Sequence, residues 1–161
     1  MVEIGRLERI DLRTIWRRED ADFTVWLANN IDYLSETLGF DIIVNRIEES
    51  VGPYRVDIYG EDSSGQKVII ENQLEKTDHT HLGQLLTYLV NLEAKTAIWI
   101  SPWPVEEHSH VVEWLNEITP DDVSIYLVKV EGLRMRGEQT IAPLFTIVAL
   151  LKNEWVTLRD H

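Results

Sequence analysis

The chain has 161 residues, of which 44% are hydrophobic, and this length suits a single domain with a substantial core. It contains no cysteine, which excludes disulfides, thiolate nucleophiles and cysteine-based zinc sites. Its 28 acidic and 15 basic residues give a formal net charge of −13, so nucleic acid is repelled at long range and any contact with it must be local, metal-assisted or supplied by a partner.

The N-terminal residues 1–18 mix charged residues with single apolar ones, which is not the pattern of a secretory signal peptide. No other stretch approaches the ~20 apolar residues that span a bilayer. We therefore expect a cytoplasmic protein without membrane contact. No repeat or flexible linker divides the sequence, and we expect one domain over residues 1–161.

The first half of the chain predicts one helix followed by an antiparallel meander. Apolar residues recur every three to four positions over residues 21–38, which is typical of an amphipathic helix. Asp20 or Asp22 suits its N-cap, and Gly39 suits its end. Three strands are then predicted from β-branched and aromatic residues separated by turn residues, over 42–47, 54–59 and 67–73.

The second half predicts alternating helices and strands. A leucine stripe over residues 82–92 and a second apolar stripe over 106–118 indicate helices, with Ile118 among the inward positions. Short apolar strands follow each helix, over 96–100 and 123–130. This order implies parallel pairing through right-handed crossovers. Residues 141–151 suit either a final strand or a short helix. The predicted fold is α/β, a mixed central sheet flanked by helices.

Two carboxylates and an amide should converge on neighbouring strands of the meander, namely Asp57 on one and Glu71 with Gln73 on the next. Alternate residues of a strand share a face, so Glu71 and Gln73 project together while Asn72 points away. Oxygen ligands of this kind suit Mg²⁺ or Mn²⁺, which could polarise a phosphate and activate water. The alternative is that Glu71 marks the exposed end of a strand.

These residues resemble a known signature. Asp57, Glu71 and Gln73 are similar to the Asp and Glu-x-Lys signature of the PD-(D/E)XK nuclease superfamily. On the following helix, Gln84 and Tyr88 lie four residues apart on one face and resemble the Gln-x-x-x-Tyr motif of its recombination-exonuclease branch. The run between signature and motif resembles a prokaryotic family of this superfamily, with similarity over most of the chain.

The resemblance implies a restriction-endonuclease-like fold with Asp57 and Glu71 as ligands of Mg²⁺ or Mn²⁺. It implies a metal-dependent nuclease or phosphodiesterase acting on nucleic acid, DNA more than RNA. It also favours a homodimer, because many nucleases of this fold cut as pairs. Gln73 departs from the usual Lys and carries no charge, so the alternative is a catalytically inactive binding or assembly module with the same fold.

A third carboxylate often comes from the first helix of such folds, where Glu36 is the candidate. Glu36 lies away from the apolar stripe, and Glu48, before the turn at Gly52, is an equal alternative. Next to the predicted helix, His79 and His81 could bind phosphate, shuttle a proton or cap the helix.

The remaining polar and aromatic candidates are weaker. A second pair, His108 and His110, is expected on the solvated surface, since positions i and i+2 of a helix point apart. The six tryptophans could stack on bases, although most are expected in the core or in an interface.

Overall fold

A computed structural model describes residues 1–149, except the side chains of Glu49 and Val51. Within these residues, seven strands form one sheet in the order β1-β6-β5-β4-β3-β2, and β7 pairs with β6. The strands are β1 (Leu7–Ile10), β2 (Ile42–Val51), β3 (Tyr54–Asp62), β4 (Lys67–Asn72), β5 (Thr96–Ser101), β6 (Ser124–Met135) and β7 (Ala142–Ala149). The helices are α1 (Leu12–Ile15), the π-helical turn η1 (Glu19–Thr24), α2 (Val25–Asn29), α3 (Asp32–Leu38), α4 (His79–Asn91) and α5 (Glu106–Ile118).

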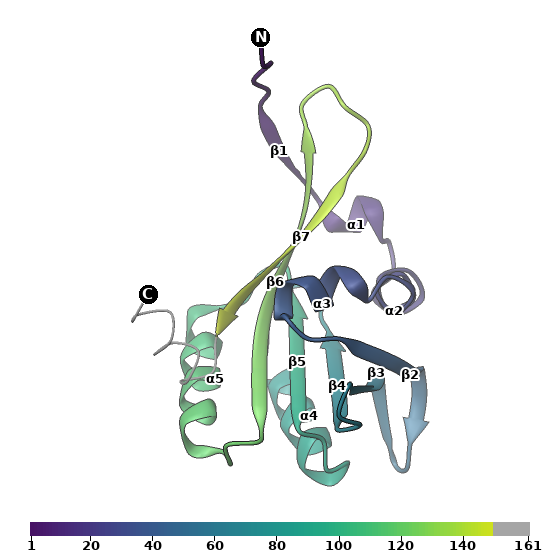
Figure 1. Cartoon of the computed structure of the whole chain (residues 1–161), viewed down its shortest axis with the longest axis vertical. Helices are drawn as coiled ribbons and strands as arrows, with labels where there is room; N and C mark the ends of the chain where they lie inside the picture. The colour runs from purple at the N-terminus through teal and green to yellow at the C-terminus, as the bar shows by residue number, and fades with distance from the viewer. Residues whose placement is uncertain (150–161) are drawn as a thin grey trace.

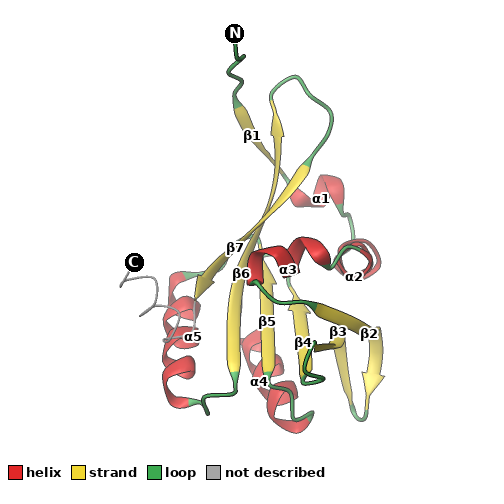
Figure 2. Ribbon diagram, in the orientation of Figure 1, coloured by secondary structure: helices red, strands yellow, loops and turns green. Residues whose placement is uncertain are grey.

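Helices cover both faces of the sheet (Figures 1 and 2). From α1 to α3 the chain buries apolar side chains such as Phe23 and Leu27 against Ile70 on one face. On the other face, α4 and α5 pack Leu85 and Val112 around Trp99. Since β4 and β5 are buried on both faces, they read in the sequence as continuous apolar runs.

The sheet topology confirms the predicted fold class. The strands β2, β3 and β4 pair antiparallel, which is the predicted meander, and β4, β5 and β6 pair in parallel through α4 and α5. The undecided segment 141–151 forms the strand β7 over Ala142–Ala149, and its last two residues lie outside the described part of the chain. The strand β1 and the short helix α1 were not predicted.

The prediction of one continuous helix over residues 21–38 was wrong. The segment divides into η1, α2 and α3, with a break at Asn30. The side chain of Asn30 donates to the carbonyl of Trp26 over 2.8 Å, a local bond of the kind that competes with helix continuation. Gly39 ends α3 in the left-handed conformation with φ of 85°, as predicted, and its N–H donates to the carbonyl of Ser35.

The helix α5 has the predicted bounds, but Ile118 at its end is exposed rather than inward. No helix among residues 1–149 is both long and apolar enough to cross a membrane.

Candidate functional site

A gap between β3 and β4 brings Asp57 and Glu71 together. Backbone pairing between the two strands ends at Ile58 and Ile70. Beyond that point Oδ2 of Asp57 accepts a hydrogen bond of 2.7 Å from the N–H of Asn72, and the N–H of Asp57 donates to Oε1 of Glu71 over 3.4 Å. Carboxylate oxygens thus replace backbone carbonyls as the hydrogen-bond acceptors between the two strands. The prediction that the two acids lie on neighbouring strands is confirmed.

Burial disfavours ionisation of this carboxylate pair. Burial, together with the charges of Glu48 and Glu19, raises the pKa of Asp57 to about 7 against the opposing hydrogen bond from Asn72. Burial and then the charge of Asp57 raise the pKa of Glu71 to about 9. A pair with such high pKa values binds protons at neutral pH unless a cation replaces them.

Two further acids face this pair, and one of them is the predicted alternative Glu48. Burial raises the pKa of Glu48, while the nearby guanidinium of Arg55, 3.6 Å from Oε2, lowers it. Within residues 1–149 its buried Oε1 has no hydrogen-bond partner. Glu48 also has a φ of 50°, which is uncommon for a residue other than glycine, and it follows the register shift of β2 between Val44 and Arg46.

The second acid, Glu19, was missed by the sequence analysis. It lies in η1, and its Oε1 accepts a hydrogen bond from the N–H of Leu74, directly after β4. Burial raises the pKa of Glu19, and the hydrogen bond from Leu74 lowers it. Its only signal in the sequence was an acidic residue at the start of the first helical segment. The predicted third carboxylate, Glu36, is exposed on α3 instead, and none of its contacts within the described residues reaches the pair.

Gln73 is fully buried, and its amide group is occupied away from the carboxylate pair. Its Nε2 donates to the carbonyl of Lys76 and to Oδ2 of Asp78, each over 2.9 Å. Its Oε1 accepts a hydrogen bond of 3.2 Å from the indole of Trp99. The carboxylate of Asp78 in turn accepts from the N–H of His81, which caps α4. Gln73 therefore joins the end of β4 to the start of α4.

The helix α4 brings Tyr88 toward the carboxylate pair. Burial raises the pKa of Tyr88, and the charges of Glu71 and Asp57 raise it as well. Its ring packs against Tyr54 of β3 with centroids 5.4 Å apart. Gln84, one turn earlier, is exposed. The supporting roles of Gln84 and Tyr88 stay predictions.

The two predicted histidines fall into different environments. Nδ1 of His81 lies 2.8 Å from Oδ1 of Asp78, and its charge also reaches Glu19. Nδ1 of His79 lies 2.8 Å from Nε2 of His108, whose own Nδ1 lies 2.7 Å from Oγ1 of Thr77. The prediction of a solvated His108 was therefore wrong, because the side chain packs on the core at Trp99.

The chemistry of the carboxylate pair fits a hard divalent cation. Within residues 1–149, no three His, Cys, Asp or Glu side chains already form a cluster that could hold a metal ion. Yet Asp57 and Glu71 offer carboxyl oxygens that form no ion pair within residues 1–149, and the buried Oε1 of Glu48 has no hydrogen-bond partner there. Uncompensated buried carboxylates of this kind are stabilised by Mg²⁺ or Mn²⁺.

Comparisons of the whole chain with known proteins show likeness at the level of structure. No family model and no curated protein matches the sequence. The structure is similar to EndoMS in a complex with dsDNA, with a TM-score of 0.52 and 15% identity over 69% of this chain and 44% of that one. It also matches a repair endonuclease from Pyrococcus abyssi, with a TM-score of 0.49 and 19% identity over 62% of this chain and 43% of that one.

A more distant match is SfsA from Pyrococcus furiosus in complex with Ca²⁺, with a TM-score of 0.38 and 18% identity over 70% of this chain and 59% of that one. The chain thus spans less than half the length of the two endonucleases. The likeness to EndoMS shows the fold, a mixed sheet flanked by helices of the restriction-endonuclease-like kind. The narrower family resemblance and the signature stay predictions.

Proposed function

We propose that this chain is a metal-dependent nuclease or phosphodiesterase domain that acts on nucleic acid, DNA more than RNA. The observation that carries the proposal is the meeting of Asp57 and Glu71 in the gap between β3 and β4. Buried Glu71 and half-buried Asp57, both with raised pKa values, lie near a third carboxylate, Glu48, whose pKa is also raised. Perturbed titratable groups of this kind are typical of catalytic sites.

In this proposal Asp57 and Glu71 hold Mg²⁺ or Mn²⁺, with Glu48 or Glu19 as the third carboxylate. The bound ion would polarise a phosphate oxygen and lower the pKa of the attacking water. Tyr88, whose pKa both acids raise, would donate a hydrogen bond to a phosphate oxygen. Gln73 acts through Asp78, which it holds at the start of α4, rather than on the water itself.

Two observations support DNA as the substrate. The fold is shared with EndoMS, and EndoMS has been solved in a complex with dsDNA. In addition, a chain with a net charge of −13 needs a cation at the point of contact with phosphate, which the metal would supply. The proposed contact is therefore short, and its strength depends on the metal.

The test is incubation of the purified chain with end-labelled single-stranded and duplex DNA and RNA in Mn²⁺. We expect cleavage of DNA, and we expect Glu71→Ala and Asp57→Asn to reduce the rate by more than the ~10–100-fold that accompanies loss of an outer-shell partner. The matched control is Glu36→Gln, which removes the same charge from an exposed position. Cleavage that persists in Glu71→Ala would sink the proposal.

One observation favours a second candidate, a nuclease-fold module that binds or assembles without cleaving. Within the described residues, the side-chain amide of Gln73 bonds to Lys76, Asp78 and Trp99. This position therefore supplies no positive charge to the carboxylate pair, where the superfamily signature has a lysine. Such a module would take up no manganese. Calorimetric titration of the wild-type chain and Asp57→Asn separates the two candidates.

A further inference from the structure

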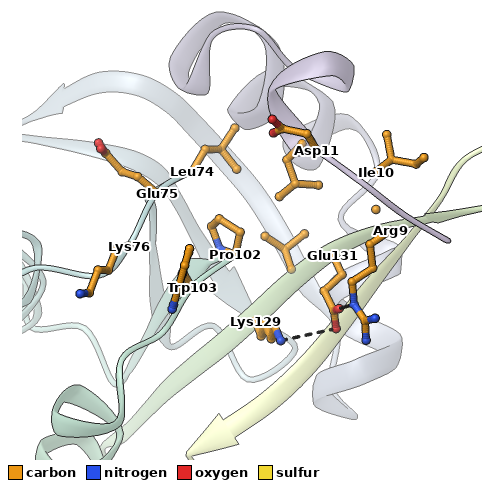
Figure 3. Close-up of a pocket in the computed structure, with 13 residues that line it drawn as sticks. Arg9, Ile10, Asp11, Leu74, Glu75, Lys76, Pro102, Trp103, Lys129 and Glu131 are labelled. Carbon is orange, nitrogen blue, oxygen red and sulfur yellow. Dashed lines mark hydrogen bonds and ion pairs between the residues drawn. The ribbon is translucent and has the colours of Figure 1, made fainter.

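A second cavity opens beside the end of β4, outside the carboxylate pair. It has a volume of about 360 Å³, within the ~300–1,000 Å³ usual for ligand pockets. Figure 3 shows side chains from β1, β6 and the segments after β4 and β5 around this space. Its apolar walls are formed by Leu12, Leu74, Pro102, Trp103 and Val130.

Trp103 lines this cavity with an exposed side chain on a backbone that is held by hydrogen bonds. Its side chain is 68% exposed, and within the described residues its ring makes no aromatic contact. Its backbone is held firmly, since its carbonyl accepts from Thr77 over 3.1 Å and its N–H donates to Oγ of Ser101 over 3.0 Å. A solvent-facing indole on a fixed backbone is a ready platform for a stacked aromatic ring.

The charges at the rim favour a nucleobase over a phosphate inside the cavity. Three carboxylates, Asp11, Glu75 and Glu131, line it. Glu131 is paired with Arg9 over 2.7 Å and with Lys129 over 4.0 Å, so these cations are already engaged. A phosphate would meet carboxylates, whereas the exocyclic amine of a base, such as N4 of cytosine, donates to them.

Lys76 stands at the outer edge of the same cavity. It pairs with Trp103 in a bridge that continues the β4–β5 pairing, so the two side chains are neighbours. In Figure 3 the Lys76 ammonium points away from Arg9 and Glu131, and it forms no ion pair within residues 1–149. An ammonium without an ion-pair partner at the edge of an apolar cavity suits binding of the phosphate group next to a bound base.

The cavity is close to the carboxylate pair along the chain and in space. Leu74 lines the cavity and donates its N–H to Glu19, whose charge reaches Asp57. Lys76 lies five positions after Glu71 in the chain, which limits the distance between their Cα atoms to roughly 18 Å. A single strand could therefore touch both places within a few nucleotides.

We propose that this cavity binds an unpaired base of single-stranded nucleic acid, stacked on Trp103 with its phosphate beside Lys76. The inference rests on the proposed function and names the form of substrate that it takes. It predicts that bases with an exocyclic amine bind better than thymine.

The test measures binding of end-labelled oligodeoxycytidine in EDTA at low ionic strength, where no cleavage occurs, by anisotropy and tryptophan quenching. We expect Trp103→Leu to remove most of the quenching and to weaken binding about 5- to 150-fold. Trp103→Phe should restore much of the affinity, which excludes a folding defect. The matched control is Trp114→Leu, since Trp114 is also 57% exposed but lies on α5 outside the cavity.

Two further measurements sharpen the result. Lys76→Gln should lower the slope of affinity against salt by about 0.7, the value for one phosphate of a single strand. Blunt duplex DNA should quench Trp103 little, because its bases are already stacked, and oligothymidine should bind less tightly than oligodeoxycytidine. Unchanged affinity in Trp103→Leu, equal quenching by duplex, or no binding by the wild-type chain would overturn the inference.

The two proposals fail separately. If cleavage depends on metal but binding is unchanged in Trp103→Leu, the proposed base-binding cavity is refuted and the proposed nuclease function stands. If binding depends on Trp103 but no divalent metal supports cleavage, the proposed nuclease function is refuted and the proposed base-binding cavity stands.

Discussion

Oδ2 of Asp57 accepts a hydrogen bond of 2.7 Å from the backbone N–H of Asn72, at the point where β3 and β4 stop pairing. The carboxylate is thus fixed by the sheet itself before any ion or substrate binds. The contact of Glu71 with the same corner is longer, at 3.4 Å, which leaves its carboxylate freer to turn. One acid is therefore prepositioned, and the other can adjust to a ligand.

Manganese should stabilise the chain, and more so as the pH rises. The ion must displace protons from the buried pair, so its apparent affinity increases from pH 6 to pH 8 and its binding releases protons. At a concentration of 100 times Kd the stabilisation is about 2.7 kcal/mol. Thermal unfolding with and without Mn²⁺ measures this effect, and calorimetry in two buffers counts the protons. An equal shift of Tm in Asp57→Asn would contradict the assignment.

In EDTA the stability should fall as the pH rises through neutrality. Asp57 and Glu71 have folded pKa values of about 7 and about 9, above their unfolded values of ~3.9 and ~4.3, so the folded state binds more protons in this window. Each such proton lowers the free energy of unfolding by up to ~1.4 kcal/mol per pH unit. Urea titrations from pH 7 to pH 9 follow the decline. We expect a flatter profile in Glu71→Gln, and an identical slope would refute the raised pKa values.

Gln73→Leu should destabilise the fold by about 1–3 kcal/mol, because it leaves the indole N–H of Trp99 and the carbonyl of Lys76 without their partner. Urea unfolding measures the loss. Gln84→Leu is the matched control, since it makes the same change on an exposed face of α4 and should stay within about 0.5 kcal/mol. Equal effects of the two substitutions would show that the buried amide network is not structural.

The contact between His79 and His108 should make the fold sensitive to mild acid. Burial lowers the pKa of His108, and the nearby His79 lowers it further, so the folded state binds fewer protons than the unfolded one. The stability contributed by neutral His108 is therefore lost as the pH falls below about 6.5, the unfolded value.

NMR titration of the ring protons and Tm from pH 7 to pH 5 test this expectation. His108→Asn should reduce the fall of Tm between pH 7 and pH 5. His110→Asn, a change of the same kind at an exposed position of α5, should not. A His108 that titrates at the ordinary value would contradict it.

The main strands and the place of the acid pair could be predicted because their signals are local. Residues 68–70 form an apolar run typical of a strand buried on both faces, and Glu71 follows it directly. The polar turn over residues 60–65 then made the strand that carries Asp57, β3, the antiparallel neighbour of β4.

Glu19 and the hydrogen bonds of Gln73 could not be predicted because they depend on tertiary contacts. Glu19 reaches the corner through a bond to Leu74, 55 residues later in the chain. Strand alternation predicted that Gln73 projects with Glu71, and its amide bonds to Trp99, the residue of β5 that is paired with Glu71. Its bonds to Lys76 and Asp78, beyond the end of β4, could not be read from the sequence. The strand β1 escaped notice because its charged residues form ion pairs across to β6, as Arg9 does with Glu131.

The pairing of β1 with β6 sets an order of events during synthesis. Arg9 and Glu131 are 122 residues apart, so β1 has no partner until almost the whole described chain has been made. At ~5–20 residues per second, a ribosome would leave this strand waiting for roughly 6–24 seconds. The projecting end of the molecule in Figure 1 is therefore the last part to close, after the central sheet and its acidic corner have formed.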